Sequence, residues 1–119
     1  MKGHPFAKRA SYALAGWREA FKTESSFRVQ VLAACLAVTC TVFVAPSPTW
    51  WAIIILAITL VLATELINTA LERMLDGLHP QHAEFIRQAK DCAAGAVLIL
   101  GCASVLLFVL MLFDSLGHN

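Results

Sequence analysis

The chain has 119 residues, of which 59% are hydrophobic and only 14% are charged, and its mean hydropathy is +0.71. A soluble domain usually carries about 25% charged residues, so this composition excludes an ordinary soluble globule and indicates an integral membrane protein. The formal net charge of +1 singles out no class of partner, and we expect no nucleic-acid partner.

The first predicted element covers residues 6–27 and mixes apolar with basic side chains. Aromatic and aliphatic residues recur there at helical spacing, and most of the lysines and arginines fall between them. This pattern predicts an amphipathic helix that lies in the membrane interface. It is compatible with a simple surface anchor and also with a helix that supplies functional groups such as Arg9, Tyr12 and Glu24.

Three apolar runs follow, at residues 29–45, 50–71 and 92–113, and they hold almost no charge apart from Glu65. The last two runs are about 22 residues long, enough to cross a hydrocarbon core of about 30 Å, and the first is marginal at about 17. Backbone at that depth must satisfy its own hydrogen bonds, so each run is predicted to be a helix. We therefore expect an all-α membrane protein, a single membrane domain over residues 1–119 with one surface helix and three transmembrane helices.

The positive charges are distributed unevenly along the chain. Lysines and arginines precede the first apolar run and flank the loop between the second and third, whereas the loop at residues 46–49 and the tail after Phe113 carry none. By the positive-inside rule, the N-terminus is then cytoplasmic and the C-terminus lies on the opposite side. No cleavable signal peptide is predicted, because the first apolar run starts late and lacks a cleavage signature.

Polar side chains interrupt the second apolar run. Glu65 and Asn68 lie inside it, Glu72 closes it, and Asp76 follows one turn later. At about 100° per residue, Glu65 and Glu72 lie about 20° apart around a helix and about 10 Å apart along it. Because a charge at membrane depth is costly unless it faces protein or water, we interpret this acidic stripe as a candidate functional site.

The depths of these groups suggest different roles. Glu65 lies within the apolar zone, where a carboxylate is suited to accept a proton from a substrate hydroxyl. Glu72 and Asp76 lie nearer water and can hold a hard cation such as Mg²⁺, while Lys90, at the same level on the next helix, can neutralise phosphate oxygens. We therefore expect a lipid alcohol to meet a metal-bound polyphosphate in a wet cleft beside Glu65.

Two functions from other classes are also compatible with the stripe. Glu65 can serve as the proton site of a small proton-coupled transporter, or the stripe can join helices in a structural or regulatory subunit. Such transporters typically have four spans and have no need for Asp76, Lys90 and Asp91 on the cytoplasmic side. The chain has neither GxxxxGK[ST] nor GxGxxG, so no common nucleotide-binding loop indicates ATP.

Several short motifs occur together in this chain. They are Tyr12, Glu24-Ser25-Ser26-Phe27-Arg28, Glu65-Leu66-Ile67-Asn68-Thr69-Ala70-Leu71-Glu72, Asp76 and Ala89-Lys90-Asp91. In this combination they resemble the prokaryotic diacylglycerol kinase family over nearly the whole chain. The resemblance implies a homotrimer of the bacterial inner membrane, with a cytoplasmic N-terminus and a periplasmic C-terminus. It also implies transfer of the γ-phosphate of ATP to diacylglycerol, which gives phosphatidic acid.

The resemblance further implies a role for each matching residue. Glu65 is the general base on the lipid hydroxyl, and Asn68 and Asp76 complete a supporting polar network. The implied Mg²⁺ ligands are Glu24 and Glu72. The implied ATP contacts are Tyr12, Glu24, Glu72, Lys90 and Asp91. The implied contacts to the lipid substrate are Arg9, Arg28, Glu65 and Ala94.

The chain departs from the family pattern at two positions. Gln30 stands where relatives often have a second Glu, and Ala94 stands where some carry a Ser near the lipid. These differences leave the reaction intact and bear on the contacts to the lipid headgroup. A branch of the family phosphorylates undecaprenol instead of diacylglycerol, and the Phe27-Arg28 pair after Glu24 favours the diacylglycerol branch.

Overall fold

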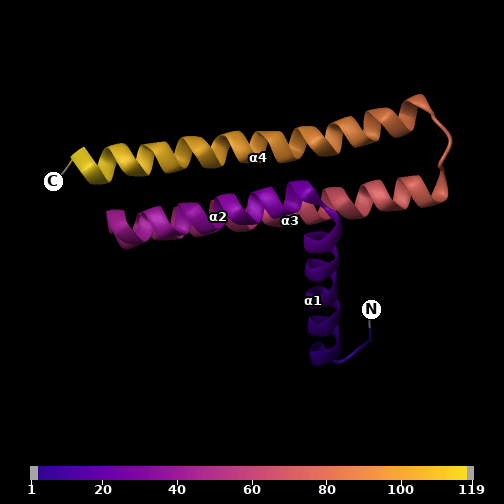
Figure 1. The fold of residues 1–119 in the computed structure, drawn as a ribbon, viewed down its shortest axis with the longest axis horizontal. Coiled ribbons are helices and arrows are strands. Elements are labelled where there is room, and N and C mark those ends of the chain that lie inside the picture. Colours follow the sequence, from indigo (N-terminus) through magenta and orange to yellow (C-terminus); the bar gives the residue numbers. More distant parts are fainter. Residues whose placement is uncertain (1–2, 118–119) are drawn as a thin grey trace.

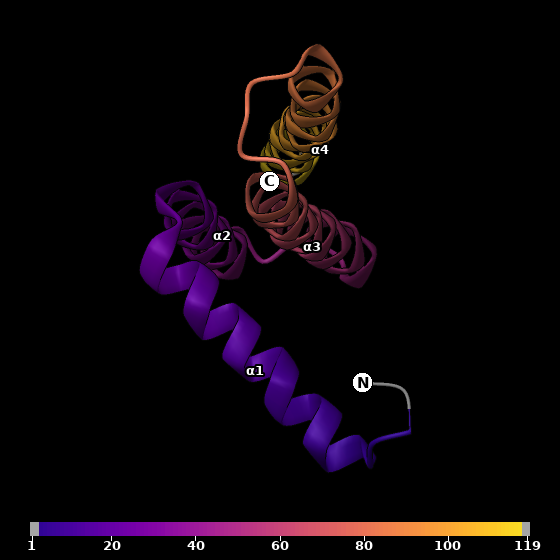
Figure 2. The same ribbon diagram turned by 90° about the vertical axis from the view of Figure 1, so that its right-hand side faces the viewer.

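The computed structural model describes residues 3–117 and contains four helices over that part of the chain (Figure 1). They are α1 (Phe6–Thr23), α2 (Ser25–Val44), α3 (Pro48–Leu78) and α4 (Glu84–Gly117). The last three run lengthwise beside one another, and α1 leaves this bundle crosswise, as the two views in Figures 1 and 2 show. The all-helical architecture agrees with the sequence prediction.

Helices α2, α3 and α4 are 20, 31 and 34 residues long, and each is long and apolar enough to cross a membrane. A span needs only about 20 residues. Helix α3 continues past the predicted run at residues 50–71, and α4 begins before the run at 92–113. The polar ends of α3 and α4 therefore extend beyond the apolar zone, at the end of the bundle where the loop between them lies (Figure 1).

The first predicted element does not continue to residue 27. Helix α1 ends at Thr23, Glu24 adopts an extended conformation with φ −112° and ψ 109°, and α2 begins at Ser25. The side chain of Arg28 donates to the carbonyl oxygens of Phe21 and Lys22 at 2.9 and 3.0 Å. Since these carbonyls have no partner within α1, the guanidinium closes that helix and stabilises the change of direction.

Helix α3 lies at the centre and packs against the other three helices. Its buried residues recur every three or four positions, which places them on one face. They are Ile54, Ala57, Val61, Glu65 and Thr69. Glu65, the acidic residue within the apolar run, is therefore part of the face through which α3 packs.

Much of the apolar surface is exposed in the single chain. The exposed side chains include Phe43 on α2, Leu98 and Ile99 on α4, and Phe113 near the end of α4. In a soluble protein such a surface marks an interaction site. On helices that can cross a membrane, it is the expected surface against lipid tails or neighbouring subunits.

A hydrogen bond joins α3 and α4 at the end of the bundle far from their connecting loop. The indole Nε1 of Trp50 donates to Oδ2 of Asp114 at 2.8 Å. The preceding turn between α2 and α3 contains Ala45 in a left-handed conformation (φ 52°), followed by Pro46. The bond between Trp50 and Asp114 holds α3 and α4 together at one end, and the α3–α4 loop connects them at the other.

We expect Trp50→Phe to destabilise the protein by about 1 kcal/mol, because it removes the donor and leaves the aromatic bulk. Thermal unfolding in detergent micelles measures the effect. Trp51→Phe is the matched control, since the Trp51 indole makes no hydrogen bond within residues 3–117. Equal shifts for the two variants would show that the bond to Asp114 contributes nothing specific.

Candidate active site

Glu65 lies on the packed face of α3 and is only 3% exposed. Its Oε2 atom is buried and has no hydrogen-bond partner within the described residues. An unpartnered buried carboxylate oxygen costs free energy, so its presence calls for a functional explanation. The orphaned oxygen has the chemistry required to accept a hydrogen bond, and then a proton, from a hydroxyl group.

The wet cleft expected beside Glu65 is not formed by residues 3–117 of a single chain, because the side chain is buried. Glu65 is buried because of its position around the axis of α3. Glu65 follows Ile54, Ala57 and Val61 at spacings of three and four residues, so it falls on the face that α3 uses for packing.

The next polar residues of the stripe contact one another along α3. Asn68 Nδ2 donates to Glu72 Oε1 at 3.4 Å, one turn further along the helix. The other amide atom of Asn68, Oδ1, is buried and also lacks a partner within the described residues. The amide thus orients the Glu72 carboxylate and leaves one acceptor next to Glu65 on the stripe.

The junction of α1 and α2 is held against the end of α3 by Arg73. This guanidinium forms ion pairs with Glu19 at 3.4 Å and with Glu24 at 3.3 Å, and it donates a hydrogen bond to Thr23 Oγ1. Because Arg73 directly follows Glu72 in the chain, the contact brings Glu24 to the turn of α3 that carries Glu72. The two acidic residues expected to hold a metal therefore lie toward the same end of α3, with Arg73 between them in the contact.

Arg73 and Glu19 were not predicted as functional residues. The sequence contains one indication that Arg73 could lie near the site, because it immediately follows Glu72 of the stripe. The pairing itself joins residues 54 positions apart, so it depends on how α1 crosses α3.

Helices α3 and α4 are joined at the same level by a second ion pair. Lys90 Nζ lies 2.6 Å from Asp76 Oδ1. Asp91 accepts a hydrogen bond from Arg87 at 2.7 Å, and Arg87 also pairs with Glu84. Lys90 and Asp91 thus lie at the polar end of the bundle, near the turns of α3 that follow Glu72.

The structure leaves other predicted residues apart from this cluster. Arg9 is exposed on α1, and the ring of Tyr12 on the same helix lies against the ring of His4, at a centroid distance of 5.7 Å. Arg28 is engaged with the carbonyls at the end of α1, and Ala94 is exposed on α4. Within the described residues of one chain, no hydrogen bond or ion pair connects Arg9 or Tyr12 with Glu65 or Glu72.

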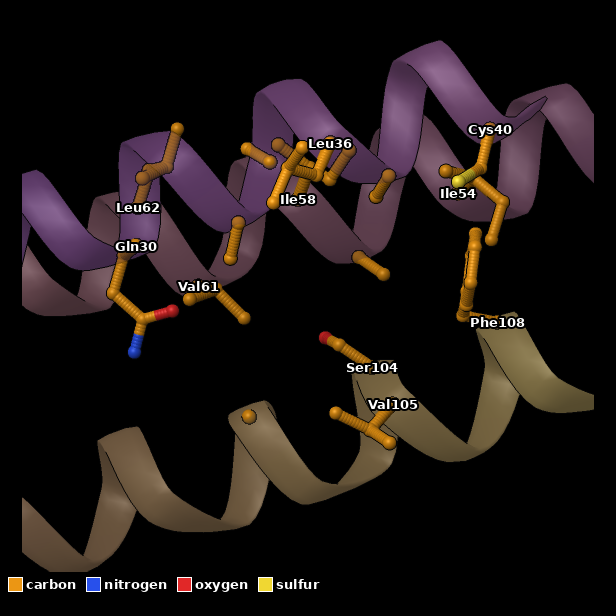
Figure 3. Close-up of a pocket in the computed structure, with 15 residues that line it drawn as sticks. Gln30, Leu36, Cys40, Ile54, Ile58, Val61, Leu62, Ser104, Val105 and Phe108 are labelled. Carbon is orange, nitrogen blue, oxygen red and sulfur yellow. The ribbon is translucent and has the colours of Figure 1, made fainter. Parts of the chain in front are cut away.

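An apolar cavity of about 320 Å³ opens between α2, α3 and α4. Gln30 points into this space from α2, and Ser104 faces it from α4 (Figure 3). The cavity reaches Val61 and Leu62 on α3, one turn before Glu65. Its lining is almost entirely apolar, which suits a hydrocarbon chain.

A second apolar cavity, of about 670 Å³, lies where α1 crosses α2 and α3. Its walls include Trp17, Phe21 and Phe27, and the basic residues Arg18 and Lys22 also line it. It reaches Leu66, the neighbour of Glu65 in the chain. Neither cavity is lined by Glu65 itself.

The acidic residues fit a magnesium ion that is shared with a substrate. Across residues 3–117, no three His, Cys, Asp or Glu side chains converge closely enough to hold a metal on their own. Mg²⁺ is commonly bound through one or two carboxylates together with substrate phosphates and water. Two carboxylates, from Glu24 and Glu72, match that mode and do not match a closed structural site.

A family model described as prokaryotic diacylglycerol kinase matches residues 11–112, which is most of the chain. The chain belongs to the prokaryotic diacylglycerol kinase family. This membership identifies it as an integral membrane protein of bacterial type and as a lipid kinase. It thereby favours an enzyme over the transporter and the structural subunit.

Individual relatives in the family carry two different names. An undecaprenol kinase from Bacillus subtilis is 34% identical over 111 residues, covering 93% of this chain and 90% of the relative. A diacylglycerol kinase from Haemophilus influenzae is 33% identical over 91 residues, covering 76% and 77%. The diacylglycerol kinase of Escherichia coli strain K12 is 29% identical over 110 residues, covering 92% and 90%. The chain is thus similar to both kinds of kinase.

Proposed function

We propose that this kinase transfers the γ-phosphate of ATP to the free hydroxyl of a membrane lipid, with Glu65 as the general base. The orphaned Oε2 of Glu65 is the observation that carries the proposal. In this reaction the lipid oxygen forms a bond to the γ-phosphorus while the bond from phosphorus to the bridging oxygen of ADP breaks. The hydroxyl proton goes to Glu65.

The polar ends of α3 and α4 provide the groups for the phosphates. Glu24 and Glu72 would hold a Mg²⁺ ion, which when bound neutralises charge on the phosphate oxygens. Asn68 supports this role because its amide orients Glu72. Lys90 and Asp91 would contact ATP, and Asp76 would position Lys90 through their 2.6 Å ion pair.

The assembly we propose is a homotrimer with sites between subunits. Arg9, Tyr12 and Ala94 are exposed in one chain, which leaves them free to complete a site with a neighbouring subunit. Tyr12 would then join the ATP contacts, while Arg9, Arg28 and Ala94 would border the lipid headgroup. In this assembly α1 lies in the interface as an amphipathic helix, with its exposed aromatic residues toward lipid.

The orientation that we propose is based on the distribution of positive charges. The basic residues near the N-terminus and around the α3–α4 loop support a cytoplasmic location for both, with the C-terminus in the periplasm of a bacterial inner membrane. ATP is therefore delivered to the side on which Glu24, Glu72 and Lys90 lie.

We propose diacylglycerol as the lipid acceptor, on the basis of the Phe27-Arg28 pair after Glu24. Undecaprenol is the second candidate, because the B. subtilis undecaprenol kinase matches 93% of the chain. Both are alcohols with long hydrocarbon chains, and both suit the apolar cavities beside α3.

Purified protein in mixed micelles with Mg·ATP and equal mole fractions of the two lipids tests this choice. We expect labelled phosphate on diacylglycerol, at a specificity constant at least about tenfold higher than on undecaprenol, a difference of about 1.4 kcal/mol in transition-state binding. The reverse preference would assign the chain to the undecaprenol branch. Phosphate on neither lipid would contradict the proposed reaction.

A further inference from the structure

The guanidinium of Arg73 is shared between two carboxylates whose expected roles differ. Nη2 lies 3.3 Å from Oε1 of Glu24, a proposed metal ligand, and Nη1 lies 3.4 Å from Oε1 of Glu19, which has no proposed role in catalysis. Glu24 is the less exposed of the two side chains, at 29% against 58%. Arg73 thus engages, in this structure, an oxygen that a divalent cation would also need.

The Arg73 guanidinium and a divalent metal ion would compete for the carboxylate of Glu24. A carboxylate oxygen that faces a guanidinium is poorly placed for a metal ion, and a doubly charged ion at Glu24 repels the guanidinium at close range. Glu19 offers Arg73 a second acidic partner that requires only a local movement, because Arg73 already contacts it. The exposed positions of Arg73 and Glu19 leave room for this change.

We propose that Arg73 shields Glu24 in the metal-free protein and moves entirely onto Glu19 when a divalent cation binds. Arg73 and Glu19 are then positioning residues that set the cation affinity of the site. This inference rests on the proposed metal role of Glu24. It gives the ion pairs at the α1–α2 junction a function in addition to holding the two helices against α3.

Binding of Mn²⁺ to the full-length protein in detergent micelles without ATP, followed by electron paramagnetic resonance, tests this exchange. We expect Arg73→Gln to bind Mn²⁺ about threefold to tenfold more tightly, since a site that is free only part of the time shows a proportionally weaker apparent affinity. Glu19→Gln is expected to bind about twofold to fivefold more weakly, because Arg73 loses its alternative partner. Glu24→Gln is expected to abolish the site.

The double variant separates the exchange from a general effect of charge. If Glu19 acts only through Arg73, the variant R73Q/E19Q has the same affinity as R73Q. Equal weakening by E19Q in both backgrounds would overturn the proposal. Lys22→Gln is a further control, because it removes a positive charge two residues from Glu24 and the Lys22 ammonium forms no ion pair within residues 3–117. Tightening by K22Q as large as that by R73Q would also overturn it.

The same preparation distinguishes this inference from the proposed function. Lipid phosphorylation by the wild-type protein, with unchanged Mn²⁺ affinity in R73Q, would overturn the exchange and leave the kinase proposal intact. Binding of Mn²⁺ that persists in Glu24→Gln would overturn both the metal role of Glu24 and the exchange.

Discussion

Glu65→Gln is expected to lower the rate of lipid phosphorylation by about a hundredfold to ten-thousandfold, the range that general acid–base catalysis supplies. Glutamine has nearly the same size and can still accept a hydrogen bond, but it cannot take the hydroxyl proton at neutral pH. Binding of Mg·ATP is expected to stay near the wild-type value, because Glu65 lies about 10 Å along the helix from Glu72. Initial rates in mixed micelles and equilibrium nucleotide binding measure the two quantities.

Stability provides an independent readout for this variant. Glu65 is buried with one oxygen unpartnered within the described residues, and burying a neutral amide costs less than burying a carboxylate. We therefore expect Glu65→Gln to unfold at a temperature equal to or above that of the wild type. A clearly lower unfolding temperature would favour a structural role for Glu65 in joining helices.

Glu84→Gln is the matched control, since it neutralises an exposed acid outside the stripe. We expect it to retain most of the wild-type activity. If Glu65→Gln turned over at the rate of this control, the assignment of Glu65 as the base would be refuted.

Glu72→Ala is expected to weaken the affinity for Mg·ATP by about tenfold to a hundredfold, the range seen when groups that hold or orient a metal are lost. The substitution removes a proposed ligand and also the acceptor of the 3.4 Å bond from Asn68. Rates measured as a function of Mg²⁺ concentration at constant ATP report the change.

Glu72→Gln separates these two losses. The amide oxygen of glutamine can still accept from Asn68, whereas its neutral group binds Mg²⁺ poorly. A weakened metal dependence in both variants supports ligation by Glu72. A change in metal dependence that occurs only in Glu72→Ala would instead be attributed to the lost contact with Asn68. An unchanged metal dependence in both variants would show that Glu72 does not contribute to the metal site.

The helices could be predicted from the sequence because each depends on a local property. Long apolar runs without charge must form helices at membrane depth, and three helices long and apolar enough to span are found. The end of α3 was predictable from a different signal. The apolar run at 50–71 stops at Leu71, but α3 continues to Leu78 because nothing breaks the helix until the segment that contains Pro80.

The break at Glu24 illustrates the limit of local reasoning. Residues 6–27 have a helical pattern throughout, yet the chain turns at Glu24, where Arg28 satisfies the carbonyls of Phe21 and Lys22. Capping by a side chain from the following helix requires the turned geometry to exist first. A periodic pattern on its own does not encode such a cap.

The part of the candidate site that lies within one helix could be predicted from the sequence, and the part that joins different helices could not. The alignment of Glu65, Asn68 and Glu72 follows from helical geometry, and the contact of Asn68 with Glu72 lies within one turn. The pairs Lys90–Asp76 and Arg73–Glu24 join different helices, so they depend on how those helices cross. Burial of Glu65 likewise depends on which face of α3 its neighbours cover.

The register of α3 has a consequence for how this enzyme can change. Ala57 and Val61 share with Glu65 the surface that fits against adjacent helices. A larger side chain at either position is expected to displace those helices and to shift Glu65, the proposed base, together with them. Substitutions in this packing face of α3 are therefore expected to change the thermal stability and the turnover rate together. This limits which of them can adapt the enzyme to a warmer membrane or to a bulkier lipid.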